Sequence, residues 1–202
     1  MCFRSKDRVF FVFEVKIMFS AETQLALVDD HTLGAMDAIY NYQIQGETVT
    51  WTYADASYYA PIQYTQAVQE IVRAVDSLID LDFQYTSNYL DADYLTYVYD
   101  YTIANRGILG THANNFWWGL TEVFYDPNST WQSNVNTFVH EFGHYLGLGE
   151  PGWDWRFDQS DTAMSYNTDP IISGGFQTFF TLNDQIVLVD LHGRENDFIT
   201  GI

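Results

Sequence analysis

Several short stretches of the chain alternate hydrophobic and polar positions and are rich in β-branched and aromatic residues. Such alternation places one set of side chains on each face of a strand, so it predicts β-structure. The clearest example is TVTWTY at 48–53. The predicted strands cover 48–53, 82–86, 95–101 and 122–125, with a further loop and strand region over 107–119.

Other stretches place apolar residues at helical spacing. Pro61 opens a predicted helix of about twenty residues, whose apolar stripe is typical of a core face rather than of a cofactor site. Further helices are predicted over about 131–146 and about 183–193, the last one ended by a glycine. Residues 21–46 have a mixed pattern that is partly helical.

A chain of 202 residues is expected to form one domain, or one domain with an appendage. Residues 1–20 differ from the rest because a basic start leads into an apolar run. Glu14 and Lys16 interrupt that run, and no small-residue cleavage site follows it. We therefore interpret 1–20 as an uncertain N-terminal leader and 21–202 as the folded domain.

The composition is strongly acidic. Twenty-seven acidic and eight basic residues give a formal net charge of −19. Such a surface repels nucleic acid and anionic membranes, so we expect neither as a partner. Solubility in a salty medium, where charge is screened within about 10 Å or less, accounts for this charge, and an acidic cleft is the alternative. The single cysteine, Cys2, excludes an internal disulfide framework and a cysteine-based zinc site.

The strongest chemical signal is an H-E-x-x-H pattern over 140–144, inside the second predicted helix. Two imidazoles four residues apart differ by about 40° around a helix axis and about 6 Å along it. His140 and His144 can therefore bind one metal ion from the same face. Glu141 lies about 100° around the axis from His140, close enough to hold a metal-bound water without being a ligand.

The residues after this pattern supply a turn and a third candidate ligand. Gly147 lets the chain leave the helix, because glycine tolerates positive φ. That turn can bring Glu150 back towards the metal. The set predicts a catalytic zinc site with His140, His144 and Glu150 as ligands.

The segment 140–166 resembles the metzincin metalloproteases, and within them the serralysin-like bacterial enzymes. The matching pieces are H-E-x-x-H-x-x-G over 140–147, Pro-Gly at 151–152 and Met-Ser-Tyr at 164–166, which is similar to the family's Met-turn. The order of predicted elements from about residue 47 also fits the family. Only 137–167 is specific.

The resemblance implies an α+β fold of the metzincin catalytic-domain type. This is a twisted mixed sheet of about five strands with a long backing helix, a zinc-site helix, the Met-turn and a C-terminal helix. It implies that His140 and His144 ligate zinc and that Glu141 is the general base for a zinc-bound water. It further implies that Met164 forms a hydrophobic floor and that Tyr166 stabilises the oxyanion.

One position departs from the family, which has histidine or sometimes aspartate where this chain has Glu150. A carboxylate oxygen is a sound zinc ligand, so we expect Glu150 to complete the site. The alternatives are Asp154 as a substitute ligand and a weakened site held by two histidines. This departure puts full activity in doubt more than it does the fold.

The other histidines, His31, His112 and His192, lie far from the motif in the sequence, and we interpret each as a surface or core histidine. By resemblance, 110–118 forms an edge strand that lines the cleft and could pair with an extended peptide. Its two tryptophans could equally belong to the core.

These observations predict a zinc-dependent endopeptidase that acts on a peptide or protein substrate. By family resemblance, it would be secreted to the extracellular space. The rival interpretation is a catalytically weakened or inactive relative that binds zinc or peptides. A zinc hydrolase with another substrate is a third possibility. The sequence does not determine the oligomeric state.

Overall fold

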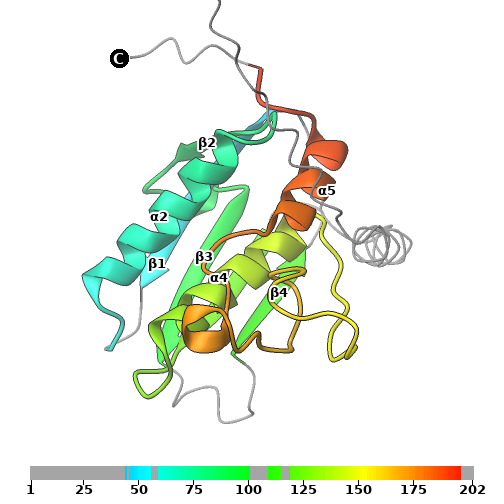
Figure 1. Ribbon diagram of the computed structural model, residues 1–202. Helices are drawn as coiled ribbons and strands as arrows, with labels where there is room; N and C mark the ends of the chain where they lie inside the picture. The colour runs from blue at the N-terminus through cyan, green and yellow to red at the C-terminus, as the bar shows by residue number, and fades with distance from the viewer. Residues whose placement is uncertain (1–43, 45, 56–58, 101–108, 115–118, 197–202) are drawn as a thin grey trace, which may run out of the picture.

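The computed structural model describes residues 44, 46–55, 59–100, 109–114 and 119–196. Within them the protein is an α+β fold built from a five-stranded sheet and three α-helices (Figure 1). The expected leader, most of the mixed region 21–46, His31, Trp117 and Trp118 lie outside the described residues.

The sheet has the strand order β2-β1-β3-β5-β4. Neighbouring strands are parallel except for β4, which runs antiparallel to β5 at one edge. This mixed sheet of five strands confirms the sequence prediction, and the 107–119 region contributes β4 and the start of β5. The strands are β1 (Thr48–Asp55), β2 (Asp82–Tyr85), β3 (Tyr94–Asp100), β4 (Gly110–Asn114) and β5 (Gly119–Tyr125).

Two helices cover the same face of the sheet and lie side by side (Figure 1). α2 (Ile62–Asp76) packs near β2, and α4 (Trp131–Tyr145) packs on β4 and β5. α5 (Leu182–His192) follows near the C-terminus, and two short 3₁₀ turns, η2 (Tyr89–Asp91) and η3 (Ser173–Gly175), lie in the connections.

α2 is shorter than the twenty or so residues that the apolar spacing predicted. Its carboxyl-terminal residue, Asp76, accepts a hydrogen bond from the backbone N–H of Phe83 in β2, at 2.6 Å. Leu78 and Ile79, which extended the apolar pattern, lie instead in the turn that leads to β2, where Ile79 is fully buried. The helix therefore stops where the chain must turn back towards the sheet.

The core lies between the sheet and the helices. Strict alternation in β5 buries every second residue, including Val123 and Tyr125, on the side that faces α4. From β3, the ring of Tyr94 stacks on Phe142 and Tyr145 of α4, with centroids 5.3 and 4.2 Å apart. Each large apolar side chain buried in this way stabilises the fold by about 1.5–3 kcal/mol.

α4 is the most enclosed of the three α-helices that the structure describes. Twelve of its fifteen residues are buried, because the sheet covers one side and the segment after the helix covers the other. A polar group on α4 is therefore either tied to a neighbour or directed into a protected site. None of the helices described is long and apolar enough to cross a membrane.

Candidate metal centre

The amino-terminal end of α4 is held by polar side chains. The Thr130 hydroxyl caps the helix by accepting a hydrogen bond from the backbone N–H of Ser133, at 3.1 Å. The Asn134 side chain bonds to both the N–H and the carbonyl of Asp126, the first residue after β5. These contacts fix the start and the rotation of the helix that carries both candidate histidine ligands.

The carboxyl-terminal end of α4 turns through a Schellman motif. Leu148 N–H donates to the Gly143 carbonyl at 2.9 Å, and Gly147 N–H donates to the His144 carbonyl at 3.0 Å. Gly147 has φ of 93°, a conformation that other residues rarely adopt. The chain thereby reverses within three residues of the helix, as the sequence predicted from Gly147.

The same turn orients one of the histidines. The ring Nδ1 of His144 lies 3.0 Å from the carbonyl oxygen of Leu148, so Nδ1 carries the proton and donates it. That tautomer leaves Nε2 of His144 with a free lone pair. A backbone partner of this kind is the usual way in which proteins orient a metal-binding imidazole.

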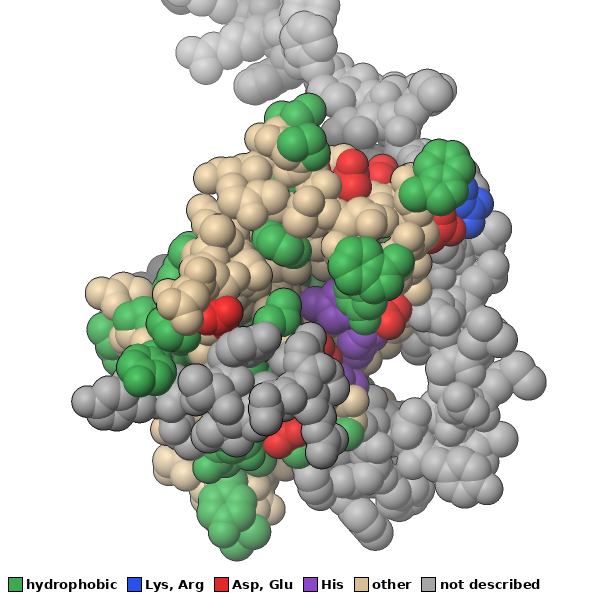
Figure 2. Space-filling view, turned by 90° about the horizontal axis from the view of Figure 1, so that it is seen from below, with side chains coloured by type: hydrophobic (Ala, Val, Ile, Leu, Met, Phe, Trp, Pro, Cys, Tyr) green, Lys and Arg blue, Asp and Glu red, His purple; other side chains and the backbone are tan. Residues whose placement is uncertain are grey.

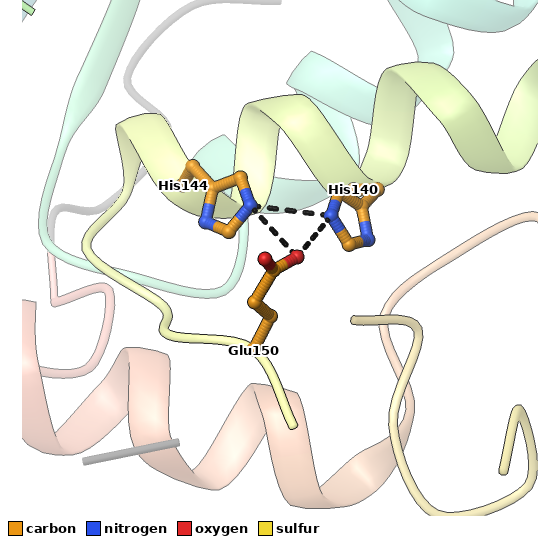
Figure 3. A group of neighbouring side chains, drawn as sticks. All are labelled: His140, His144 and Glu150. Carbon is orange, nitrogen blue, oxygen red and sulfur yellow. Dashed lines mark hydrogen bonds and ion pairs between the residues drawn. The ribbon is translucent and has the colours of Figure 1, made fainter. Parts of the chain in front are cut away.

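Three potential ligand atoms converge next to α4 (Figure 3). Nε2 of His140 lies 2.9 Å from Oε2 of Glu150 and 3.2 Å from Nε2 of His144. Nε2 of His144 lies 3.4 Å from the same carboxylate oxygen. The structure thus brings together all three residues that the sequence suggested as ligands.

The spacing of these atoms is close to that around a metal ion. Bonds of about 2.0–2.2 Å from zinc to nitrogen and oxygen place tetrahedral ligands about 3.3–3.6 Å apart. The separations of 3.2 and 3.4 Å are near this range, and the 2.9 Å between His140 and Glu150 is a hydrogen-bond distance. Two imidazole lone pairs facing each other at 3.2 Å repel unless a proton or a cation lies between them. The group of His140, His144 and Glu150 could therefore hold a metal ion.

The electrostatic environment of Glu150 also favours the binding of a metal ion. Burial opposes its ionisation, but hydrogen bonds with His140, His144 and Tyr166 hold the pKa of this carboxyl well below its usual range. For His144, burial acts against the charged ring, yet the contact with Glu150 raises its pKa, whereas burial lowers the pKa of His140. Glu150 is therefore an anion next to two imidazole nitrogens, which is a donor set suited to a divalent cation.

Glu141 lies beside the cluster without belonging to it. It is buried, and its burial raises the pKa of the carboxyl to about 7. Gly110 of β4 packs directly against it, because a Cβ placed on Gly110 would lie 2.7 Å from Cγ and 2.8 Å from Oε1 of Glu141. The edge strand and the helix thus approach closely where a catalytic base would stand.

The turn that contains Met164 supports the site from below. Met164 is fully buried, and a Cβ placed on Gly143 would lie 2.5 Å from its sulfur atom. Gly143 therefore allows this turn to pack against α4 between the two histidines. The ring of His140 also donates a hydrogen bond to the carbonyl of Ala163, which orients this second imidazole.

Tyr166 follows that turn and stands over the cluster. Its ring centroid lies 5.3 Å from that of His140, and its hydroxyl hydrogen-bonds the carboxylate of Glu150. Burial and the neighbouring acidic groups raise its pKa, so the hydroxyl keeps its proton and acts as a donor. The sequence predicted Tyr166 near the site, and the structure brings it there.

A pocket of about 380 Å³ opens beside these residues. Figure 2 shows histidine side chains reaching the surface in this hollow, with hydrophobic and acidic side chains around them. The pocket is lined by Leu109, Gly110, Asn136, Thr137, His140, Glu141, Trp153, Ser165, Tyr166 and Phe176.

The alternative candidates from the sequence lie elsewhere. Both carboxylate oxygens of Asp154 accept hydrogen bonds from Arg156, at 2.6–3.0 Å, and Asp154 is not a member of the ligand group. His112 contacts the hydroxyl of Thr121 through Nδ1, and His192 contacts the carbonyl of Leu146 through Nε2. These two histidines support packing between elements.

Sequence reasoning missed several residues that build the site. Gln159 is fully buried, and its amide donates to the carbonyls of Ser165 and Ala163 and accepts from Asn136. Asp184 of α5 accepts from the backbone N–H of Ala163, at 2.9 Å. The Thr-x-x-Asp pattern at 181–184 is a capping signal that could have identified Asp184, whereas nothing in the sequence pattern distinguishes Gln159.

Comparison with known proteins adds little to this geometry. No protein-family model matches the sequence, and no curated protein matches it either. Among solved structures, the chain is similar to a crystal structure of myroilysin, with 13% identity and a TM-score of 0.47. The match covers 75% of this chain and 86% of that chain. At that level of likeness, function has to be inferred from the site itself.

Proposed function

We propose that this protein is a zinc-dependent endopeptidase. The observation that carries the proposal is the convergence of two imidazole nitrogens and one carboxylate oxygen on a point beside a second, buried carboxylate. Nitrogen and carboxylate ligands together favour zinc over the harder ions magnesium and calcium, which prefer oxygen alone. The family resemblance of 140–166 supports the same choice.

The proposed roles follow from the positions of the side chains. His140, His144 and Glu150 would hold the zinc ion, and their contacts to Ala163, Leu148 and Tyr166 would orient them. When bound, zinc would supply Lewis-acid polarisation of the scissile carbonyl and would make water a better nucleophile.

Proton transfer would fall to Glu141. This carboxylate would accept a proton from the attacking water and donate it to the leaving amine as the peptide bond breaks. Tyr166 keeps its hydroxyl proton, so its O–H could donate to the oxyanion that forms on the substrate. Both side chains line the pocket, where a substrate can reach them.

The edge strand β4 offers a binding surface for the substrate backbone. β4 pairs with β5 along one side, and no other strand of the described structure pairs with its opposite side. An extended peptide could add to that side by main-chain hydrogen bonds. Because Gly110 of β4 also packs against Glu141, a peptide bound there would pass close to the proposed base.

The rival function is metal or peptide binding without turnover, and Glu150 is the reason for it. An anionic third ligand reduces the effective charge of zinc and makes it a weaker electrophile than a neutral histidine would. A rival that holds zinc predicts the same zinc content as the proposal and differs from it only in turnover, whereas a rival that binds peptides alone requires no zinc.

Zinc content and casein digestion together test the proposal. We expect about one zinc ion per chain by mass spectrometry, and casein digestion that stops with 1,10-phenanthroline and returns with added zinc. Glu141→Ala should retain zinc and lose at least about 100-fold of the activity, because it removes the base but none of the ligands. Glu122→Ala, a carboxylate of β5 outside the pocket, is the matched control and should digest casein normally.

Two results would count against the proposal. Zinc-loaded protein that cleaves neither casein nor a mixed peptide library would favour the binding rival. Protein purified without metal and unable to take up zinc would contradict the peptidase proposal and leave only the form of the rival that binds peptides without metal.

A further inference from the structure

Two tryptophans in the loop after Glu150 are exposed to an unusual degree. Trp153 is 75% exposed and Trp155 is 88% exposed. Large aromatic side chains in such positions mark binding surfaces more often than chance would place them there. The two differ in one respect: Trp153 lines the pocket beside the candidate metal centre, and Trp155 does not.

We propose that Trp153 is a substrate-contacting residue that makes the site select an apolar side chain next to the cleaved bond. This inference rests on the proposed peptidase function, and it adds the chemical class of the substrate residue and the side chain that recognises it.

The backbone holds Trp153 in place before any substrate binds. The carbonyl of Gly152 accepts a hydrogen bond from Tyr166 N–H at 3.0 Å, and Gly152 forms a parallel bridge with Ser165. The amide of Asn167 donates to the carbonyl of Asp154 at 2.8 Å, on the other side of the tryptophan. Because these hydrogen bonds fix the backbone on both sides of Trp153, little conformational entropy is lost when the indole contacts a ligand.

The indole ring is also oriented by its neighbour. It meets the ring of Tyr166 edge-on, with centroids 5.3 Å apart and an interplanar angle of 67°. Tyr166 in turn lies 5.3 Å from the ring of His140, so the aromatic contacts run from Trp153 to the metal ligands. The contact with Tyr166 therefore restricts the indole, and most of its surface is open to a ligand.

The rest of the pocket is suited to an apolar side chain. Leu109 and Phe176 add hydrophobic surface to that of Trp153. Three uncharged polar side chains of the wall already have partners within the protein. Their hydrogen bonds run from Asn136 to Gln159, from Thr137 to the Ser133 carbonyl and from Ser165 to the Phe157 carbonyl.

Charge disfavours acidic and basic side chains. The described wall contains no lysine or arginine, so an acidic substrate side chain would meet Glu141 without a basic side chain of the protein to pair with. A basic side chain would lose its hydration, and its only acidic partner in the wall would be the carboxylate needed for proton transfer. The volume of about 380 Å³ accommodates a leucine or an aromatic ring.

Dipeptide hydroxamates that differ in one side chain test this inference without requiring turnover. We would measure their binding to the zinc-loaded protein by calorimetry, with glycine, leucine, phenylalanine and aspartate at the variable position. In the wild type, leucine and phenylalanine should bind at least about ten-fold more tightly than glycine, and aspartate should bind most weakly.

Three variants identify the residue responsible. Trp153→Ala should reduce the preference for phenylalanine over glycine to about two-fold or less, and Trp153→Phe should keep most of it. Trp155→Ala, the matched control, should keep the preference of the wild type. Zinc content and circular dichroism should be the same in all four proteins, since neither tryptophan is buried.

The outcomes separate this inference from the proposed function. If the wild type cleaves peptides but Trp153→Ala keeps the full preference, the inference is wrong and the peptidase proposal stands. An equal loss in Trp155→Ala would also overturn it, because the effect would then not be specific to the pocket. If the preference depends on Trp153 but no peptide is cleaved, the peptidase proposal fails and the apolar pocket stands.

Discussion

The carboxylate of Glu150 contacts His140, His144 and Tyr166, and no other side chain described here joins both histidines in one cluster. Its reach depends on the turn at Gly147, which directs residue 150 back along α4. A glutamate is longer than an aspartate, and here the added length is used to bring one oxygen between two imidazoles.

Glu150→Ala should therefore weaken zinc binding by at least about 100-fold, because loss of an orienting residue behind a ligand alone costs 10–100-fold. Competition with a fluorescent zinc chelator measures this directly. Asp154→Ala, which removes a carboxylate of the same loop that bonds Arg156 instead, is the control and should bind zinc normally. Equal zinc affinity in Glu150→Ala and the wild type would show that Glu150 is not a ligand.

Two glycines contribute to the site because they have no side chain, which leaves room for neighbouring side chains to pack closely. Gly143 admits the sulfur of Met164, and Gly110 admits the carboxylate of Glu141. In both places a methyl group would come within 3 Å of the neighbouring side chain, closer than a normal contact. The distance between α4 and its neighbours is therefore set by the absence of side chains as much as by packing.

At the scale of elements, α5 is tied to the turn that supports the metal centre. Asp184 is fully buried and completes a capping box with Thr181 at the start of α5. The same carboxylate accepts hydrogen bonds from the Thr162 hydroxyl and the Ala163 N–H. Burial raises the pKa of this carboxyl, against the opposing effect of these bonds.

Replacing Asp184 by alanine should lower the free energy of unfolding by about 3 kcal/mol, because several buried donors lose their acceptor at once. In a chain of this size, that corresponds to a decrease of about 6–12 °C in Tm by thermal denaturation. Asp190→Ala, an exposed aspartate of the same helix, should change Tm by about 1 °C or less. A similar small shift for both variants would mean that the link between α5 and the turn contributes little.

At the scale of the whole molecule, the site joins parts of the chain that the sheet alone does not hold. The ligands come from α4 and the following loop, and the pocket wall comes from α4, β4, that loop and the segment after Met164. A bound ion would therefore tie the loop to the helix, and its binding energy would add to the stability of the fold.

Removing the metal should lower the stability of the folded protein. At a zinc concentration 1,000 times the Kd, binding adds about 4 kcal/mol, which corresponds to about 8–16 °C in Tm. We expect this decrease after dialysis against a chelator, with recovery on addition of zinc but not of magnesium, since the site contains two nitrogen ligands. The same Tm with and without zinc would contradict a metal site in this position.

The fold and the site differ in how far local pattern determines them. Alternation predicted β1, β3 and β5 within a few residues, because a strand with one buried face must alternate. Helical spacing predicted α4 and the common face of His140 and His144 for the same kind of local reason. The predicted length of α2 was wrong, because a contact from Asp76 to a later strand ends that helix.

The sequence by itself therefore determined most of the strands, the main helices and the group of His140, His144, Glu141 and Glu150 as candidates, and the mixed sheet followed only from the family resemblance. Local spacing on one helix and one glycine turn is enough to suggest them. Tertiary structure decided the rest. It separated Glu150 from Asp154, placed Gly110 against Glu141 and brought Trp153 to the pocket wall. Each of these depends on contacts between segments distant in the chain, and no local pattern encodes such distances.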